Sequence, residues 1–185
     1  MMTVIVAGVS GCGKTTVGEL LAERLSQQRD CGVRTDVRAP RWQFIDGDSL
    51  HPEANVAKMA RGEPLTDADR APWLRRIGSR IDAEEAAGHR SVVACSALKR
   101  RYRAELLGGR PSARMAFLMI DYEVACERLK ARRGHFFDAS LLGSQFAALE
   151  PPAPDEDRVV SVPVRDQPEA TVSDVLRALG LVASS

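Results

Sequence analysis

Near its amino terminus the chain carries a glycine-rich segment that fits the pattern GxxxxGK[ST], namely Gly8-Val9-Ser10-Gly11-Cys12-Gly13-Lys14-Thr15. The segment follows a short apolar run, Val4 to Ala7, and precedes apolar residues at helical spacing. In such a strand, loop and helix, glycines let successive backbone N–H groups point at a phosphate, and the helix N-terminus adds positive potential. The flanking strand and helix argue against a chance glycine-rich turn. The segment therefore predicts a nucleotide-phosphate site at the edge of a parallel sheet.

Individual residues of this loop have separate expected roles. The ammonium group of Lys14 is expected to neutralise the outer phosphates, and the hydroxyl of Thr15 to ligate Mg²⁺. The loop binds mainly through backbone N–H groups, so the thiol of Cys12 is compatible with it. Because Cys12 lies near a helix N-terminus, its pKa is expected to be lowered, which predicts a reactive thiol when the loop is empty.

The rest of the chain alternates short apolar runs with stretches of helical periodicity. The runs predict strands at 4–7, 44–45, 91–95, 115–120 and 159–162, and the helical stretches begin at Lys14 and cover roughly 67–87, 97–107, 122–132, 138–149 and 169–179. Apolar runs without alternation are typical of strands buried on both faces. The pattern predicts an α/β fold with a five-stranded parallel sheet and helices on both faces, in a single domain spanning residues 1–185.

Two segments lie outside this alternation. Residues 29–42 are rich in charge and show no apolar period, so we expect an exposed loop, to which we assign no function. Residues 150–157 are proline-rich and acidic, and we expect them to form a surface connection into the last strand.

Charge and composition exclude several classes of protein. The chain has 26 Lys and Arg against 25 Asp and Glu, so a formal net charge of +1 gives no electrostatic case for nucleic acid or an anionic membrane as partner. No apolar stretch is long enough to span a bilayer, and no basic region precedes the first apolar run. The four cysteines form no CxxC pair and have no histidine at zinc-ligand spacing. We expect a soluble cytoplasmic protein with reduced thiols.

Two carboxylates follow the second expected strand, in Phe44-Ile45-Asp46-Gly47-Asp48. Residues two apart at a strand end project to the same side, and Gly47 allows close backbone approach, so both acids can face the phosphate loop. Asp46 is a candidate to hold Mg²⁺ through water, and Asp48 to orient an acceptor hydroxyl and take its proton late in phosphoryl transfer. An ordinary turn is the alternative, but the nearby phosphate loop favours the functional interpretation.

A basic run, Arg128, Lys130, Arg132 and Arg133, precedes Gly134-His135-Phe136-Phe137. Cations, a glycine and an aromatic pair in this order are typical of a small mobile lid, here at about residues 130–140. Such a lid would exclude water, and an arginine such as Arg132 would neutralise charge on the transferring group. We include His135 among the candidates for substrate binding. A solvated basic helix end is the alternative.

Further cations are candidates to bind an acceptor. Lys99 and Arg103 are four residues apart on an expected helix and therefore share a face. With Arg70 and His51 they could bind an anionic or polyhydroxylated molecule, in a substrate-binding segment that includes residues 48–75. A charged helix face in water would explain the same residues.

Other nucleotide-dependent classes fit less well. Guanine-selecting GTPases usually carry Asn-Lys-x-Asp, yet Asn55 is the sole asparagine and has another context. The strand 91–94 does not end in the metal-linked aspartate of motor ATPases. A nucleotide-binding module without turnover is the alternative from a different class, but it leaves the acid pair and the arginine-rich lid unexplained. We favour a small-molecule kinase.

Several segments together resemble the gluconokinase family, namely GVSGCGKTT, FIDGDSLHPEANVAKMARGEPLTDADRAPWL, VACSALKRRYR, RLKARRGHFF and RDQP, in order over most of the chain. That family is similar in fold to shikimate and nucleoside monophosphate kinases. The resemblance therefore implies a P-loop NTPase-type three-layer sandwich. It also implies transfer of the ATP γ-phosphate to the 6-hydroxyl of D-gluconate, giving 6-phospho-D-gluconate, with Mg²⁺ and often in a homodimer.

The resemblance also assigns residues by position. It implies that residues Gly8 to Thr16 cradle the triphosphate and that Asp48 contacts the sugar acid, while Arg128 lies against the adenine, opposite Gln167 and Pro168. The chain departs from the family at Cys12, where serine or glycine is more usual, and in the long segment 29–41. Kinases acting on shikimate, adenylylsulfate or a nucleotide remain alternatives.

Overall fold

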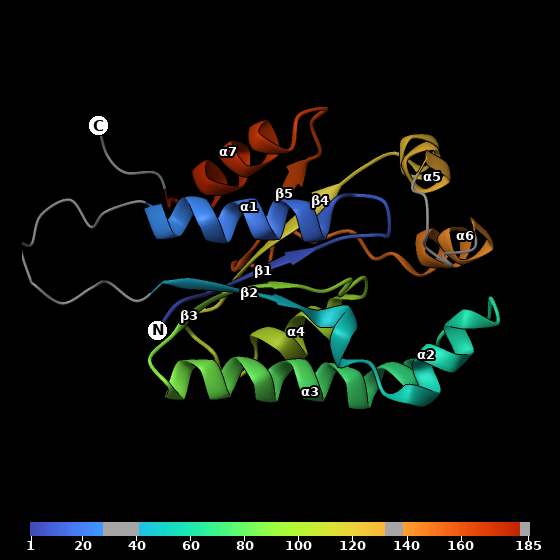
Figure 1. The fold of residues 1–185 in the computed structure, drawn as a ribbon, viewed down its shortest axis with the longest axis horizontal. Helices are drawn as coiled ribbons and strands as arrows, with labels where there is room; N and C mark the ends of the chain where they lie inside the picture. The colour runs from blue at the N-terminus through green and yellow to red at the C-terminus, as the bar shows by residue number, and fades with distance from the viewer. Residues whose placement is uncertain (28–40, 132–138, 182–185) are drawn as a thin grey trace, which may run out of the picture.

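The computed structural model describes residues 1–27, 41–131 and 139–181 (Figure 1). Its centre is a sheet in the order β2-β3-β1-β4-β5, in which every neighbouring pair is parallel. The strands are β1 (Thr3–Ala7), β2 (Trp42–Asp46), β3 (Arg90–Ala94), β4 (Arg114–Met119) and β5 (Val159–Pro163). The five-stranded parallel sheet predicted from the sequence is confirmed.

Helices cover both faces of the sheet. On one face α1 (Lys14–Gln27) packs beside α7 (Pro168–Ala178), and on the other α3 (Asp67–Ala86) packs beside α4 (Arg100–Leu107) (Figure 1). The helices α2 (Glu53–Ala60), α5 (Tyr122–Ala131) and α6 (Ala139–Ala148) lie beyond the carboxyl ends of the strands, at the right of Figure 1. The two covering layers and the sheet form the expected three-layer sandwich.

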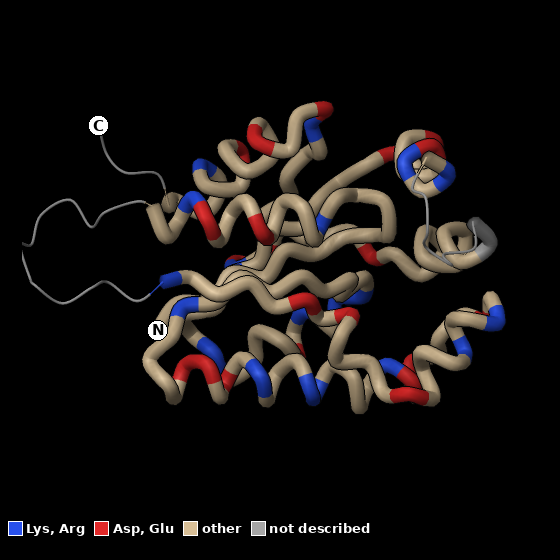
Figure 2. The backbone as a smooth tube through the Cα atoms, viewed as in Figure 1, with Lys and Arg blue, Asp and Glu red and all other residues tan. Residues whose placement is uncertain are grey.

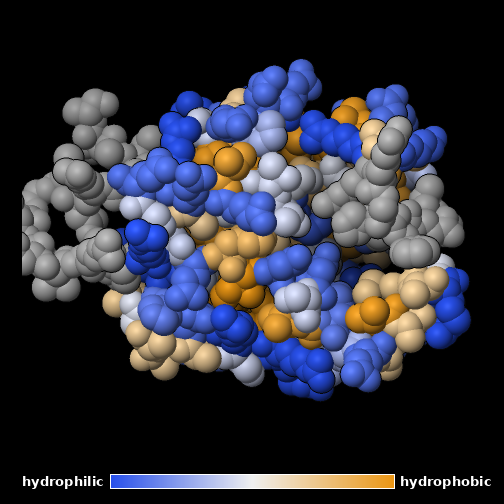
Figure 3. Space-filling model, in the orientation of Figure 1, coloured by the Kyte–Doolittle hydropathy of each residue, from blue (hydrophilic) through white to orange (hydrophobic). Residues whose placement is uncertain are grey.

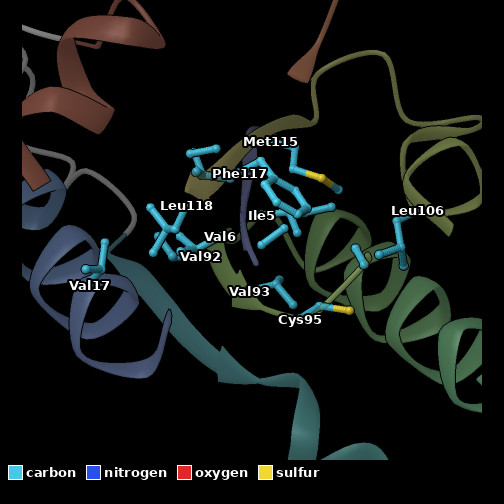
Figure 4. Packing of buried hydrophobic residues seen from close by; sticks show 14 of the residues in the cluster. Ile5, Val6, Val17, Val92, Val93, Cys95, Leu106, Met115, Phe117 and Leu118 are labelled. Carbon is cyan, nitrogen blue, oxygen red and sulfur yellow. The ribbon is translucent and has the colours of Figure 1, made fainter. Parts of the chain in front are cut away.

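The core lies on both sides of the central strands. All five residues of β1 are buried, and Ile5 pairs with Val93 of β3 and with Met115 of β4. Figure 4 shows these side chains together with Phe117 and Leu118. Branched apolar residues pack well on a pleated surface that is covered on both faces, which explains why the unalternating apolar runs became the central strands.

The structure differs from the predicted elements at three places. Residues 53–60 form α2, which the sequence analysis missed because Val56 of this helix is exposed and Asn55 is its buried residue, so no apolar period marks it. Before α2, residues Gly47–Leu50 form a 3₁₀ turn. The fourth helix begins at Arg100 rather than 97, because Ala97 has a φ of 37°, which a right-handed helix cannot include.

The two segments outside the alternation have different outcomes. The predicted loop 29–42 falls largely outside the described residues, and its last residue, Trp42, begins β2. Residues 150–157 connect α6 to β5 without a helix or strand, as predicted. Across residues 1–27, 41–131 and 139–181, no helix has the length and apolarity needed to cross a bilayer.

Charged residues of both signs are interspersed along the outer helices (Figure 2). On the face shown in Figure 3, hydrophilic residues alternate with small hydrophobic groups. This distribution agrees with the near-zero net charge of the chain.

Candidate active site

A cavity of about 570 Å³ opens outside the carboxyl end of β1, where the strand order reverses, the usual ligand position in an open α/β sheet. Four segments that are distant in the sequence line it: the phosphate loop with the start of α1, the acid pair after β2, the end of α5, and the segment after β5. The lining residues are Ser10, Gly11, Cys12, Gly13, Lys14, Thr15, Thr16, Val17, Asp46, Asp48, Arg128, Leu129, Val164, Arg165, Asp166, Pro168 and Thr171.

The phosphate loop is held by backbone contacts that depend on glycine. Gly11 has a φ of +83°, and a Cβ placed there would lie 2.7 Å from the carbonyl oxygen of Ala125 in α5. The N–H of Gly8 donates to the carbonyl of Ser96, 3.2 Å away, which ties the loop to the segment after β3. Lys14 donates from Nζ to the carbonyl of Val9 at 3.1 Å. This bond holds the ammonium group across the loop that it was predicted to serve.

The prediction of a reactive Cys12 is wrong. Its side chain is fully buried within the loop, and burial raises the pKa of the thiol, against the smaller lowering effects of Lys14 and Arg128. Removal of the thiolate from water outweighs the positive potential at the helix N-terminus. Cys12 therefore packs as a small apolar side chain, and the loop is left to bind through its backbone and Lys14.

The acid pair lies where it was predicted. Asp46 and Asp48 both line the cavity, and Asp46 Oδ1 accepts the N–H of Asp48 at 3.0 Å, so Asp46 caps the 3₁₀ turn. A Cβ at Gly47 would overlap the carbonyl oxygen of Ala94, which confirms that this glycine permits close backbone approach. Trp73 Nε1 donates to the carbonyl of Gly47 at 2.7 Å. These contacts fix the backbone between the two acids.

His51 lies directly behind Asp48. Its ring stacks on Trp73 with centroids 4.2 Å apart and planes inclined by 10°, and its Nε2 is 3.9 Å from Asp48 Oδ1. The side chain is 5% exposed. Burial lowers the pKa of His51 to about 4, and the charge of Arg70 acts in the same direction, against the raising effect of Asp48. The ring is therefore neutral at pH 7.

The tautomer of His51 is set by Asn55. The Nδ2 of this amide donates to the carbonyl of Asp69 at 2.8 Å and lies 3.3 Å from His51 Nδ1. Because Asn55 offers a donor there, Nδ1 accepts and the ring proton lies on Nε2, facing Asp48. Lys58 of α2 bonds the carboxylate of Asp69 at 2.7 Å, and Thr66 and Asp69 form a capping box at the start of α3. These bonds fix α2 and α3 around the acid pair.

The structure contradicts the prediction that Arg103 binds the acceptor substrate. This side chain is 0% exposed, and its guanidinium bonds Glu156 bidentately at 2.7 and 2.8 Å and the carbonyls of Leu98 and Glu150 at 3.1 and 2.8 Å. Every nitrogen of the guanidinium has a protein partner. Arg103 does lie on a helix that Lys99 caps, as its spacing of four residues predicted. The face of this helix that carries Arg103, however, packs on the 150–157 connection.

Lys99 lies at the N-cap of α4 and bonds Asp67 of α3 at 2.9 Å. Arg101 and the hydroxyl of Tyr102 contact the same carboxylate, and these bonds, with that of Arg101 the strongest, hold the pKa of Asp67 well below its usual range. Asp67 thus joins α3 to α4. Lys99 is engaged in this cluster, and Arg70 stands in the first turn of α3, where its positive charge contributes to the lowered pKa of His51.

Arg128 and Pro168 both line the cavity, and Arg128 Nη2 donates to the carbonyl of Arg165 at 3.3 Å. Gln167 is the N-cap of α7, directly before Pro168. The sequence analysis missed other residues here, Leu129, Val164, Arg165, Asp166 and Thr171. For Val164, Arg165 and Asp166 a signal was available, because they directly follow β5 and the residues after a parallel strand point into the ligand site, whereas Leu129 and Thr171 lie in α5 and α7. Arg132 and His135 lie outside the described residues.

No family model matches the chain. Individual relatives do: the gluconokinase of Gluconobacter oxydans is 44% identical over 175 residues, which cover 94% of this chain and 88% of that protein. The thermoresistant gluconokinase of Escherichia coli is 39% identical over 176 residues, covering 95% of this chain and 91% of that one.

A solved structure agrees with these relatives. The crystal structure of a gluconokinase from Sinorhizobium meliloti superposes with a TM-score of 0.79 and 39% identity, covering 97% of this chain and 91% of that one. On the identity and coverage of these relatives, this chain belongs to the gluconokinase family.

Proposed function

We propose that this chain catalyses the ATP-dependent phosphorylation of D-gluconate at its 6-hydroxyl, giving 6-phospho-D-gluconate and ADP. One observation carries the proposal: the phosphate loop and the acid pair of Asp46 and Asp48 line a single cavity. A loop that binds phosphates beside a carboxylate that can receive a hydroxyl proton is the arrangement that phosphoryl transfer needs. Membership of the gluconokinase family supports D-gluconate as the acceptor.

The residues divide the work between donor and acceptor. The loop from Gly8 to Thr16, with the ammonium of Lys14, binds the triphosphate, and the adenine lies between Arg128 on one side and Gln167 with Pro168 on the other. The oxygen of the gluconate 6-hydroxyl bonds to the γ-phosphorus, and Asp48 accepts the proton of that hydroxyl. The bond from the phosphorus to the β–γ bridging oxygen breaks, and ADP leaves. His51, proton-bearing at Nε2, lies 3.9 Å from the Asp48 carboxylate.

Mg²⁺ fits the donor set of this cavity. Magnesium prefers oxygen ligands and commonly takes one or two from protein together with phosphates, and the Thr15 hydroxyl and Asp46 carboxylate line the same cavity. Among the described residues no group of three or more His, Cys, Asp and Glu could hold a metal alone. We therefore assign Thr15 as a direct ligand of Mg²⁺ and Asp46 as a ligand through water. The ion when bound would neutralise charge on the phosphates.

Three further assignments are part of the proposal. Arg70 and Lys99 are the cations proposed to receive the gluconate carboxylate, since Arg103 is buried. Arg132 and His135, in the segment 130–140, are proposed to approach the transferring phosphate and the acceptor as a lid. The resemblance supports a homodimer, which analytical ultracentrifugation tests directly.

Asp48→Asn tests the proposed chemistry. The amide retains the size of the side chain but cannot take a proton, so kcat with D-gluconate should fall by about a hundredfold or more, while ATP affinity stays within about threefold. Asp155→Asn, at an exposed pair remote from the cavity, is the matched control. Turnover is measured by ADP release over a panel of sugar acids, shikimate and adenylylsulfate. Wild-type kcat in Asp48→Asn would contradict the role of Asp48, and turnover with another acceptor alone would contradict gluconate.

A further inference from the structure

Helix α6 carries one polar residue on its inward face. Leu142, Gln145 and Phe146 stand at positions i, i+3 and i+4 and therefore form one stripe, and Leu149 directly follows the helix end at Ala148. Leu142 is fully buried, and Phe146 and Leu149 pack against the core. A carboxamide within an apolar stripe must be compensated by hydrogen bonds. The partner of Gln145 therefore indicates what this residue contributes.

That partner is Ser10, 135 residues away in the phosphate loop. The N–H of Ser10 donates to Gln145 Oε1 at 2.7 Å, and Gln145 Nε2 donates to Ser10 Oγ at 2.9 Å. One planar amide thus fixes both the backbone and the side chain of Ser10. The two bonds also settle which end of the amide is oxygen, since the backbone N–H can only donate.

These bonds leave the hydroxyl proton of Ser10 available. Because Oγ accepts from Gln145, its own proton must point elsewhere, and Ser10 lines the cavity together with Lys14 and Thr15. A phosphate oxygen is a hydrogen-bond acceptor and could receive the proton of this hydroxyl. The neighbouring Gly11 is in close contact with Ala125 and Leu129 of α5. Helices α5 and α6 therefore hold two consecutive residues at the tip of the loop.

We propose that Gln145 is a positioning residue that holds Ser10 so that the Ser10 hydroxyl donates to a phosphate of the bound nucleotide. The proposal deepens the function given above and rests on the phosphate loop binding ATP. Gln145 acts through Ser10, so α6, which begins directly after residues 132–138, contributes to the phosphate site from outside the loop.

Binding without acceptor tests this role. ATP and adenosine affinities are measured by displacement of a fluorescent ATP analogue from Ser10→Ala, Gln145→Leu and the double variant. Each single variant should weaken ATP binding about tenfold, since a hydrogen bond to a charged group contributes on the order of that factor. The double variant should also lose about tenfold, because both changes remove the same donor. Adenosine, which lacks phosphate, should bind within about twofold of wild type throughout.

The control is Ser144→Ala, beside Gln145, whose hydroxyl donates to the Leu141 carbonyl and, among the described residues, to no other group; it should bind ATP like wild type. Three results would overturn the proposal: unchanged ATP affinity in folded Gln145→Leu, a loss in the double variant equal to the product of the single losses, or an equal loss for adenosine. If Gln145→Leu does not fold, Ser10→Ala decides alone, and unchanged ATP affinity there refutes the donor role. These binding measurements contain no gluconate, so their outcome does not depend on whether the protein phosphorylates gluconate.

Discussion

Replacing Glu156 by glutamine should destabilise the protein strongly, although the residue is remote from the acid pair. Its carboxylate receives Nε and Nη2 of Arg103 at 2.8 and 2.7 Å and also accepts the N–H of Ala153 at 2.9 Å. The two side chains are 0% and 8% exposed. Glutamine replaces one of the two carboxylate oxygens that accept from Arg103 by an NH₂ group, which can only donate. It also leaves the positive charge of Arg103 uncompensated.

The expected loss is about 3 kcal/mol. Breaking a buried ion pair from one side costs about 3–5 kcal/mol, and the two backbone carbonyls that Arg103 retains favour the lower end. For a chain of this length each kcal/mol lowers Tm by about 2–4 °C, so Tm should fall by about 6–12 °C. Differential scanning calorimetry measures the shift. Replacing the pair together, in Arg103→Met with Glu156→Leu, should recover much of the loss.

The exposed pair of Arg100 and Asp155 in the same connection is the control. Asp155→Asn should cost at most about 1 kcal/mol, because solvent screens that pair. In Glu156→Gln, the KM for D-gluconate should stay within about twofold of wild type well below Tm. Equal Tm values for the two variants would refute the buried-pair argument. A tenfold rise in the KM of Glu156→Gln for D-gluconate, with an unchanged Tm, would indicate instead that Arg103 binds the acceptor substrate.

Three further predictions follow from the site. Gly47→Ala forces a Cβ into a backbone carbonyl and should cost about 2–3 kcal/mol, whereas Gly143→Ala, whose Cβ meets no atom of the described residues within 4 Å, should cost nothing in the same urea titration. The lowered pKa of His51, about 4 against about 6.5 when unfolded, means that only the unfolded chain takes up this proton between those values. Stability should therefore be full above pH 6.5 and fall by about 2 kcal/mol toward pH 4, allowing for solvent screening, and His51→Gln should flatten that slope in unfolding curves measured at each pH. Iodoacetamide at pH 7.5 should label the partly exposed Cys126 but not the buried Cys12, as peptide mapping would show; labelling of native Cys12 at the rate found in urea would contradict its burial.

The sequence predicted the sheet well because each strand is marked locally. Unalternating apolar runs such as Val92 and Val93 can only be buried on both faces. The phosphate loop and acid pair were also predictable, because both follow directly from a strand end. Helix α2 was not, since its buried residue is the polar Asn55, whose partners come from other segments.

The errors share one physical cause, which is burial that depends on distant residues. Arg103 has the spacing of an exposed helix face, and only the return of residues 150–157 encloses it. Cys12 has the helix N-terminus that lowers a thiol pKa, but packing within the loop removes it from water. The contact of Ser10 with Gln145 likewise joins residues that no local pattern connects.

The chain leaves α1 at Gln27 and enters β2 at Trp42, at the amino ends of the strands, while the cavity opens at their carboxyl ends (Figure 1). The two attachment points, Gln27 and Trp42, are thus separated from the cavity by the length of the strands. A change at either attachment point would be transmitted to the nucleotide only through α1 or β2.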